Sequence, residues 1–265
     1  MNVGKKLVGI PSRQGGDACR TQSDKVLIVC DFDGTACSVD MGSKILDRFA
    51  GEGWRDIDRA YCANEIGSRL AYTNIAPLFR GSRSEMVEFV HANASLDPFF
   101  ADFYLFCRTQ GYDLKIASDG LDFYIETVLK KHGLADIEYY ANAATFMGEG
   151  EGLSIGFPHL SDRCGRCGTC KSGIVKELRS RYDRIIYIGD SYSDVCASGV
   201  ADLVFAKFIL YEKCRENGTA CVRYENFRDI MDYLKNIFPA VLPDGETRKR
   251  RQAPYLPDQP DQRVG

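Results

Sequence analysis

Two carboxylates separated by one residue occur in the stretch VCDFDGTAC, where Asp31 and Asp33 follow an apolar run. Carboxylates this close repel each other unless a cation holds them, and their hard oxygen atoms suit Mg²⁺. Further polar groups follow apolar runs or open helical patterns later in the chain, at Ser118-Asp119-Gly120, at Lys171, and in the stretch GDSYSD with Asp190 and Asp194. The sequence therefore contains the ligands of a divalent cation, provided that the fold brings these groups together.

The elements that must position these groups alternate between strands and helices. Near-continuous apolar runs, as expected for parallel strands covered on both faces, occur at 25–32, 112–118, 184–190 and 202–208. Helical patterns lie between them at 97–111, with Asp97 as the expected N-cap, at 121–133 and at 170–182. This alternation predicts an α/β fold with a doubly wound, Rossmann-like parallel sheet. Ligands of such a sheet bind beyond the carboxyl ends of the strands, where the polar groups fall.

Composition divides the chain into parts. Residues 25–41 and 96–238 form the expected α/β core, whereas residues 42–95 carry several short helical patterns without a strand and predict an inserted α-helical segment. Residues 142–157 indicate a glycine-turned hairpin. The polar N-terminal segment 1–24 and the proline-rich, charged tail 239–265 are expected to be disordered.

The ordered set DFDGT, Ser118, Lys171 and GDSYSD resembles the four motifs of the haloacid dehalogenase superfamily, over about residues 25–238. The resemblance implies that Asp31 attacks phosphorus and forms an aspartyl phosphate. It also implies that Asp33 protonates the leaving alcohol and then deprotonates the attacking water. Dehalogenases of this superfamily lack the second aspartate, so Asp33 favours phosphoryl chemistry.

The same resemblance implies the remaining roles at the site. Mg²⁺ would lie between Asp31, the main-chain carbonyl of Asp33, and Asp190, and Asp194 would orient Lys171 or a metal-bound water. Ser118 and Lys171 would bind the phosphoryl oxygens. The other residues expected to contact phosphate or substrate are Thr35, Asp119, Gly120 and Asp40.

The helical insertion resembles the cap of the phosphoserine-phosphatase-like branch, and SDGLDFYIETVL and FPHLSDRCGRCGTCKSGIVKEL resemble phosphatases of methionine salvage. This implies a Mg²⁺-dependent phosphomonoesterase for a small metabolite such as 2-hydroxy-3-keto-5-methylthiopentenyl-1-phosphate. The alternatives are a phosphoserine, phosphocholine or phosphoethanolamine phosphatase, or a non-catalytic zinc-loop binding protein on the same fold. Asp119 stands where that branch usually has glycine. Asp40 falls where phosphoserine phosphatases carry a substrate-facing acid, and a solvated surface aspartate is the competing interpretation.

Cysteines form a cluster before Lys171, at Cys164, Cys167 and Cys170, with His159 upstream. These four side chains could hold a structural Zn²⁺ that fixes the loop. The alternative, which we favour, is a glycine-rich loop of reduced thiols. The other eight of the 11 cysteines are scattered among apolar neighbours, and no export signal precedes them. We therefore expect a reducing compartment, the cytoplasm.

Composition also excludes some partners. The 265 residues are 45% hydrophobic and 27% charged, as in an ordinary globular chain, and the formal net charge of −3 gives no general attraction to nucleic acid or to an anionic membrane. An apolar run of about twenty residues, the length of a membrane-spanning helix, is absent from the sequence. We expect the partner to be a small phosphorylated metabolite, and the protein to be a monomer or a homodimer.

Overall fold

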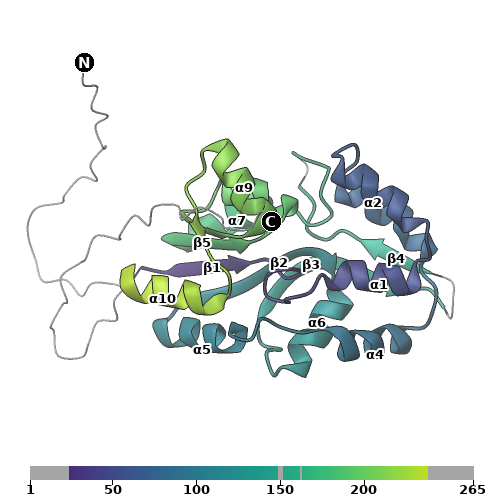
Figure 1. The fold of residues 1–265 in the computed structure, drawn as a ribbon, viewed down its shortest axis with the longest axis horizontal. Coiled ribbons are helices and arrows are strands. Elements are labelled where there is room, and N and C mark those ends of the chain that lie inside the picture. The colour runs from purple at the N-terminus through teal and green to yellow at the C-terminus, as the bar shows by residue number, and fades with distance from the viewer. Residues whose placement is uncertain (1–23, 149–151, 162, 238–265) are drawn as a thin grey trace, which may run out of the picture.

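The computed structural model describes residues 24–148, 152–161 and 163–237. Within these ranges a seven-stranded sheet has the strand order β4-β3-β2-β1-β5-β6-β7 (Figure 1). Neighbouring strands pair in parallel except β4, which runs antiparallel to β3. The strands are β1 (Val26–Cys30), β2 (Asp113–Leu121), β3 (Glu138–Phe146), β4 (Leu153–Gly156), β5 (Arg184–Gly189), β6 (Leu203–Ala206) and β7 (Val222–Arg223).

Helices cover both faces of this sheet. Helices α5, α6 and α10 lie on one face, and α7 and α9 lie on the other (Figure 1). The α-helices are α1 (Met41–Phe49), α2 (Trp54–Cys62), α3 (Ser68–Ile75), α4 (Arg83–Asn93), α5 (Phe100–Gln110), α6 (Asp122–Lys131), α7 (Lys171–Leu178), α8 (Val195–Ser198), α9 (Phe208–Asn217) and α10 (Phe227–Ile237). Short 3-10 helices are η1 (Ala76–Leu78), η2 (Arg179–Arg181) and η3 (Tyr192–Asp194). The doubly wound α/β fold is thus confirmed.

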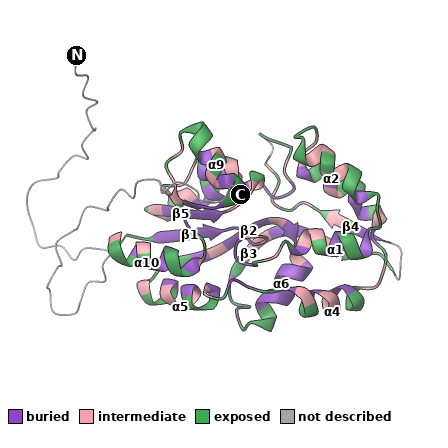
Figure 2. Cartoon of the chain, in the orientation of Figure 1, coloured by how far each residue is buried: buried purple, intermediate pink, exposed green. Residues whose placement is uncertain are grey.

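Strand β1 occupies the centre of the sheet because its side chains are apolar on both faces. Successive side chains of a strand point in opposite directions. Val26, Ile28 and Cys30 therefore pack into the layer of α5, α6 and α10, whereas Leu27 and Val29 pack against α7. All five are buried, in the purple interior of Figure 2. Burial of a Val, Leu or Ile side chain stabilises the fold by roughly 1.5–3 kcal/mol. The burial of β1 therefore fixes the position of the residues that follow it.

Helices α1 to α4 fill residues 41–93, where the sequence predicted an inserted helical segment. Local capping fixes where two of them begin. The Asp40 carboxylate accepts the N–H of Ser43 at the start of α1, and Ser82 and Glu85 form a reciprocal capping box at the start of α4. Helix α4 packs against both α1 and α6, so the segment is joined to the core layer. We propose that helices α1 to α4 form a cap.

Two local predictions need correction. Helix α5 does not start at an Asp97 N-cap, because its N-cap is Phe99 and the Asp97 carboxylate instead accepts the Phe99 N–H at 2.9 Å. The Asp97 carbonyl accepts the Phe100 N–H at 3.0 Å, so a turn at Asp97 precedes the helix, which begins at Phe100. The antiparallel pairing of the predicted hairpin is confirmed, with Phe146 opposite Leu153, and residues 149–151 of its expected glycine turn lie outside the described residues. Its first strand, β3, begins earlier than expected and also pairs in parallel with β2.

The expected disorder of residues 1–24 and 239–265 concerns segments that lie, apart from Asp24, outside the described residues. Among the helices that are described, none combines the length and the apolar character needed to cross a bilayer.

Candidate active site

The carboxyl edge of the sheet gathers the side chains that the motifs predicted. Strand β1 ends just before Asp31, β5 ends just before Asp190, and α7 begins at Lys171. A cavity of about 380 Å³ opens at this edge. The predicted site residues that line it are Asp31, Asp33, Asp40, Ser118, Asp119, Gly120, Lys171 and Asp190. The two other predicted residues of the site, Thr35 and Asp194, are fully buried.

Asp31 is buried and contacts the ammonium of Lys171. Its Oδ1 lies 2.7 Å from Lys171 Nζ and accepts the N–H of Phe32 at 2.7 Å. Burial, together with the charge of Asp194, raises the pKa of Asp31 well above its usual range, and the Lys171 charge opposes this shift. Among the described residues, none donates a hydrogen bond to the second oxygen, Oδ2. One oxygen of Asp31 is therefore held by the protein, and the other is open to react.

Asp33 is held by hydrogen bonds from two different helices. Its Oδ1 accepts the N–H of Met41, the first residue of α1, at 2.8 Å, and its Oδ2 accepts the hydroxyl of Tyr124 on α6. Burial raises the pKa of Asp33 to about 7, and the nearby Asp40 charge adds to the shift. A carboxyl group with a pKa near neutrality can both give and take a proton at physiological pH.

The approach of Tyr124 to the carboxyl edge requires a glycine. A Cβ atom on Gly120 would lie 1.7 Å from the Tyr124 hydroxyl oxygen, which no side chain tolerates. Burial and the Asp33 charge raise the pKa of Tyr124 well above its usual range, so its hydroxyl stays protonated and donates. The glycine of the second motif thus lets Tyr124 orient Asp33.

Lys171 is buried, and all three protons of its ammonium have acceptors. Its Nζ lies 2.7 Å from Asp31 Oδ1, 2.7 Å from Asp194 Oδ1 and 2.8 Å from Ser193 Oγ. Burial alone would lower the pKa of Lys171, but the charges of Asp194 and Asp31 outweigh it and raise the pKa above its usual range. The ammonium is therefore permanently charged and lies beside Asp31.

Asp194 is surrounded by hydrogen-bond donors. Its Oδ1 accepts Lys171 Nζ and the Tyr187 hydroxyl at 2.6 Å, and its Oδ2 accepts the backbone N–H groups of Asp190 and Ser191 at 3.0 and 2.9 Å. Burial would raise the pKa of Asp194, but Lys171 and the hydrogen bonds lower it below its usual range. With both oxygens already bonded, Asp194 is suited to orienting Lys171.

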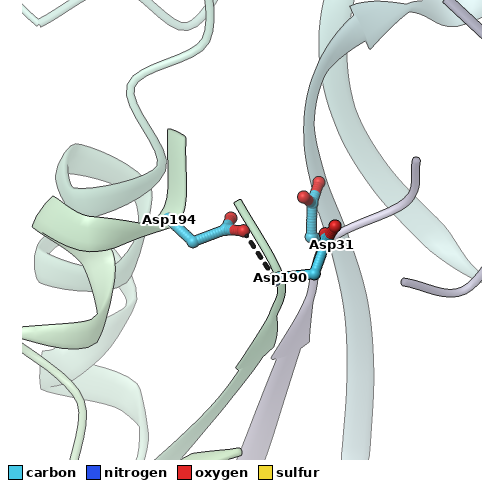
Figure 3. Close-up of side chains that lie close together, drawn as sticks. All are labelled: Asp31, Asp190 and Asp194. Atoms are coloured by element: carbon cyan, nitrogen blue, oxygen red, sulfur yellow. Dashed lines mark hydrogen bonds between the residues drawn. The ribbon is translucent and has the colours of Figure 1, made fainter. Parts of the chain in front are cut away.

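Asp190 and Asp31 lie side by side at the ends of adjacent strands, and Asp194 faces them (Figure 3). Asp190 Oδ1 accepts the Thr35 hydroxyl at 2.8 Å. Burial and the Asp194 charge raise the pKa of Asp190 to about 6. Gly34, with φ of +72°, makes room, because a Cβ atom there would lie 2.5 Å from Asp190 Oδ2.

These carboxylates fit a hard divalent cation. In the part of the chain that the structure describes, Asp31, Asp190 and Asp194 form the one group of three candidate ligands, and their oxygen atoms lie within 4.8 Å of one another. Among the described residues, the ammonium of Lys171 contacts two of these three carboxylates and that of Lys207 also acts on Asp190, so three formal negative charges still exceed the nearby positive charge. Carboxylate and carbonyl oxygens are the ligands that Mg²⁺ prefers.

The second motif provides a hydroxyl at the floor of the cavity. Ser118 is buried, and its Oγ accepts the N–H of Gly120 at 3.0 Å, so its own proton remains available to a phosphoryl oxygen. Asp119 is turned toward the loop before α7 and accepts the N–H of Thr169 at 2.9 Å. Burial raises the pKa of Asp119. Asp40 caps α1 and also lines the cavity, so the structure gives it a local role besides the predicted one.

The four residues proposed as zinc ligands do not form a metal-binding cluster. Among the described residues, His159, Cys164, Cys167 and Cys170 form no cluster of convergent ligand atoms. His159 packs its ring edge-on against Tyr140, Cys164 is exposed and Cys170 is buried. Zinc at this loop is therefore not supported. The cysteines of the described ranges are free thiols, and Cys196, one of the eight with apolar neighbours in the sequence, is exposed rather than buried as such neighbours would suggest.

Sequence reasoning missed three hydroxyl groups, those of Tyr124, Tyr187 and Ser193. Each bonds a charged group of the site, respectively Asp33, Asp194 and Lys171. Ser193 lies inside the GDSYSD motif and could have been found there. Tyr124 follows the second motif by one helical turn, which is a weak signal, and Tyr187 reads as an ordinary strand residue.

Comparison with known proteins gives relatives over most of the chain. Residues 26–216 match the family described as "Putative Phosphatase". A 2-hydroxy-3-keto-5-methylthiopentenyl-1-phosphate phosphatase of Brevibacillus brevis is 30% identical over 223 residues, which cover 83% of this chain and 100% of that protein. The bifunctional enzyme MtnB/MtnX of Bacillus licheniformis is 31% identical over 232 residues, which cover 86% of this chain and 53% of that enzyme.

Solved structures resemble the fold. A phospho-aspartyl intermediate analogue of phosphoserine phosphatase superposes with a TM-score of 0.63 at 20% identity, covering 80% of this chain and 99% of that one. A substrate-bound phosphoserine phosphatase superposes with a TM-score of 0.58 at 19% identity and the same coverage.

Proposed function

Since the chain belongs to this phosphatase family, within the haloacid dehalogenase superfamily, we propose that it hydrolyses a small phosphate monoester through an aspartyl phosphate on Asp31. One observation carries the proposal. Asp31 has one oxygen held by Lys171 and the other free, at the floor of a cavity that also contains Asp33. The two carboxyl groups that we propose as nucleophile and acid/base thus line the same cavity. This favours turnover over a non-catalytic binding role.

In the first displacement, Asp31 Oδ2 attacks phosphorus and the bond from phosphorus to the ester oxygen breaks. The leaving alkoxide takes a proton from Asp33, which Tyr124 and the Met41 N–H hold in place. Burial raises the pKa of Asp33, which favours the protonated form that this step needs. General acid catalysis of this kind contributes roughly 10²–10⁴-fold in rate.

In the second displacement, water attacks the phosphorus of the aspartyl phosphate. Asp33, now ionised, takes a proton from that water, and the bond between phosphorus and Asp31 breaks. Inorganic phosphate leaves, and both carboxyl groups return to their starting states. Splitting the hydrolysis this way replaces one difficult displacement with two easier ones.

Ser118 would donate a hydrogen bond to a phosphoryl oxygen in both steps, whereas Lys171, whose three ammonium protons already have acceptors, would attract the phosphoryl oxygens through its charge. Lys171 also neutralises Asp31 before the attack, so the approach of an anionic phosphate costs less. Its three acceptors hold the ammonium in one place, as expected of a pre-organised electrostatic group.

The donor set fits Mg²⁺, and the side chains of Asp31 and Asp190 with the main-chain carbonyl of Asp33 would hold it. When bound, such an ion supplies positive charge that polarises the phosphoryl group. Thr35 and Gly34 act by orienting Asp190 and by leaving space around it.

The substrate that we propose is 2-hydroxy-3-keto-5-methylthiopentenyl-1-phosphate. The names of relatives at about 30% identity support it. The cavity supports it too, because the apolar side chains of Leu46, Ile75 and Ile209 line the walls and suit a methylthio group.

A second candidate is the phosphate ester of an alcohol that bears an ammonium group, such as phosphoserine, phosphocholine or phosphoethanolamine. The observation that favours it is the negative charge on the walls of the cavity. Asp40, Asp58 and Asp119 line the cavity with Tyr61 and Tyr72, and among the described lining residues Lys171 alone is basic. Carboxylates and aromatic rings together attract an ammonium group.

Initial rates with Mg²⁺ on these four esters test both candidates, with Asp31→Asn as the inactive control. We expect the highest kcat/KM with 2-hydroxy-3-keto-5-methylthiopentenyl-1-phosphate. A ranking led by an aminoalcohol ester would favour the second candidate. If the protein releases phosphate from none of the four esters and not from p-nitrophenyl phosphate, the proposed function is overturned.

We also propose a reducing compartment, the cytoplasm, as its location, because the described cysteines are unpaired thiols.

A further inference from the structure

Asn142 is a fully buried amide that the chemistry above does not use. It lies on β3, opposite Leu121, where the pairing of β2 with β3 shifts register after Ala117. Its side chain is absent from the residues that line the cavity. A buried amide without hydrogen bonds destabilises a fold, so the partners of Asn142 account for its buried position.

The Asn142 amide joins two segments that flank the reacting phosphate. Its Nδ2 donates to the Asp119 carbonyl at 2.6 Å and to Asp119 Oδ1 at 3.2 Å. Its Oδ1 accepts the Thr169 hydroxyl at 3.2 Å. Thr169 N–H in turn donates to the same Asp119 carboxylate at 2.9 Å, which closes a triangle of three residues. Gly168 allows this approach, because a Cβ atom there would lie 2.5 Å from Asn142 Oδ1.

The two partners of Asn142, Asp119 and Thr169, are each close in sequence to a residue of the proposed mechanism. Asp119 follows Ser118 directly. Thr169 precedes Lys171 by two residues, and its carbonyl accepts the Lys171 N–H at 3.1 Å. A shift of the Asn142 amide would therefore change the spacing between the Ser118 hydroxyl and the Lys171 ammonium.

The same loop is held from its other side by the helices over the cavity. Gly168 N–H donates to Ser68 Oγ at 3.1 Å, and the Arg69 N–H donates to the Arg166 carbonyl at 3.0 Å. The Arg166 guanidinium also bonds Asn64 at 2.9 Å. These bonds hold the outer part of the loop, whereas its last residues are held by Asn142 and Asp119 at Thr169 and by the His159 carbonyl, which accepts the Cys170 N–H at 2.8 Å.

We propose that Asn142 is a positioning residue that sets the distance between Ser118 and Lys171, acting through Asp119 and Thr169. The inference rests on the proposed function, since it assigns Asn142 a part in the same phosphoryl transfer. It goes beyond the four motifs, because Asn142 belongs to none of them and touches neither phosphate nor metal ligands.

The test compares the parent with Thr169→Val, Thr169→Ser and Asn142→Asp. Valine removes the hydroxyl that bonds Asn142 but keeps the backbone N–H that bonds Asp119, whereas serine keeps both. Asn142→Asp replaces the donor facing Asp119 with an acceptor. The matched control is Thr127→Val on α6, which removes another buried hydroxyl, bonded to the Phe123 carbonyl.

Two readouts separate positioning from a loss of folded protein. The first is kcat and KM, and the second is inhibition by vanadate, whose five-coordinate complex mimics the transition state, compared with inorganic phosphate. Thr169→Val should lower kcat on the order of 10-fold, and Asn142→Asp on the order of 10²-fold, since displacements near 1 Å have effects of this size. The vanadate inhibition constant should rise in parallel, and the phosphate constant and KM should change much less. Thr169→Ser and Thr127→Val should behave as the parent does.

Parental kcat and vanadate inhibition in Thr169→Val would overturn the inference, whether or not Asn142→Asp folds. An unchanged inhibition constant for vanadate in variants with lower kcat would also overturn the inference. A smaller folded fraction alone lowers kcat and leaves that constant unchanged. An equal loss in Thr127→Val would have the same consequence. A parent protein that hydrolyses no phosphate monoester would refute the proposed function first, and this inference with it.

Discussion

Replacing Asp194 with asparagine should destabilise the protein strongly, because every partner of its carboxylate is a donor. Asp194 is fully buried. Its Oδ1 accepts Lys171 Nζ at 2.7 Å and the Tyr187 hydroxyl at 2.6 Å, and its Oδ2 accepts the N–H groups of Asp190 and Ser191. Asparagine offers one oxygen in place of two. In either orientation its NH₂ group must face two donors.

The size of the effect follows from these contacts. Two hydrogen bonds are lost, and the buried ammonium of Lys171 loses one of its two carboxylate partners, leaving Asp31. Breaking one side of a buried ion pair costs roughly 3–5 kcal/mol, and this figure already includes the lost hydrogen bonds. The free energy of unfolding should therefore fall by about 3–5 kcal/mol. At roughly 2–4 °C per kcal/mol for a chain of this size, Tm should fall by about 6–20 °C.

Urea unfolding followed by circular dichroism measures this loss, in chelator so that bound metal does not contribute. Asp47→Asn is the matched control, because Asp47 pairs with Arg55 at 2.6 Å while both side chains are about half exposed, at 50% and 53%. Such surface pairs contribute roughly 0–1 kcal/mol. Equal losses in the two variants would refute the argument that Asp194 is the electrostatic anchor of Lys171.

The same pair of proteins gives a pH test. Lys171 and the hydrogen bonds lower the pKa of Asp194 against the effect of burial. A carboxylate with a lowered pKa stabilises the fold above its unfolded pKa of about 3.9, and that contribution is lost as pH falls through the folded pKa. The stability difference between parent and Asp194→Asn should thus be constant near neutrality and shrink in acid. A difference that grows toward low pH would contradict the assignment.

Further predictions concern the nucleophile, the acid/base, the metal and the apo protein. Asp31→Asn should fold but release no phosphate, and substantial turnover by the purified variant would exclude Asp31 as the nucleophile. Asp33→Asn should slow release of a poor leaving alcohol by around 10²–10⁴-fold and of p-nitrophenol much less, as measured by single-turnover kinetics; equal losses would argue against the acid role. Chelation should stop turnover and Mg²⁺ restore it, with Asp190→Ala needing more Mg²⁺, and full activity after exhaustive chelation would rule out a metal requirement. Because burial raises the pKa of Asp33 to about 7, the chelated parent should lose stability relative to Asp33→Asn as pH rises from about 4 to about 7, and parallel Tm curves would show that this shift is absent.

The motifs and the central strands were predictable because they depend on local pattern. The run ending at Cys30 is apolar at every position, so it is buried on both faces and lies inside a parallel sheet. The carboxyl ends of parallel strands share one edge, so Asp31 and Asp190 were expected near one another, whereas Ser118, expected at a strand end, lies inside β2, which continues to Leu121. The zinc hypothesis shows the limit of this reasoning, since the spacing of cysteines sets which ligands are available but not where their side chains point.

The packing around the site was decided by the tertiary structure alone. Asp33 meets Tyr124 across 91 residues, and Asn142 meets Thr169 across 27, through hydrogen bonds whose geometry depends on helix placement and on the shift in strand register. Asn142 stands in a stretch that predicts only a hairpin, and nothing in its neighbours distinguishes it from a surface residue. The sequence by itself determined which chemical groups stand at the strand ends. Their protonation, orientation and support came from distant side chains, because burial and long-range hydrogen bonds exist only in the folded chain.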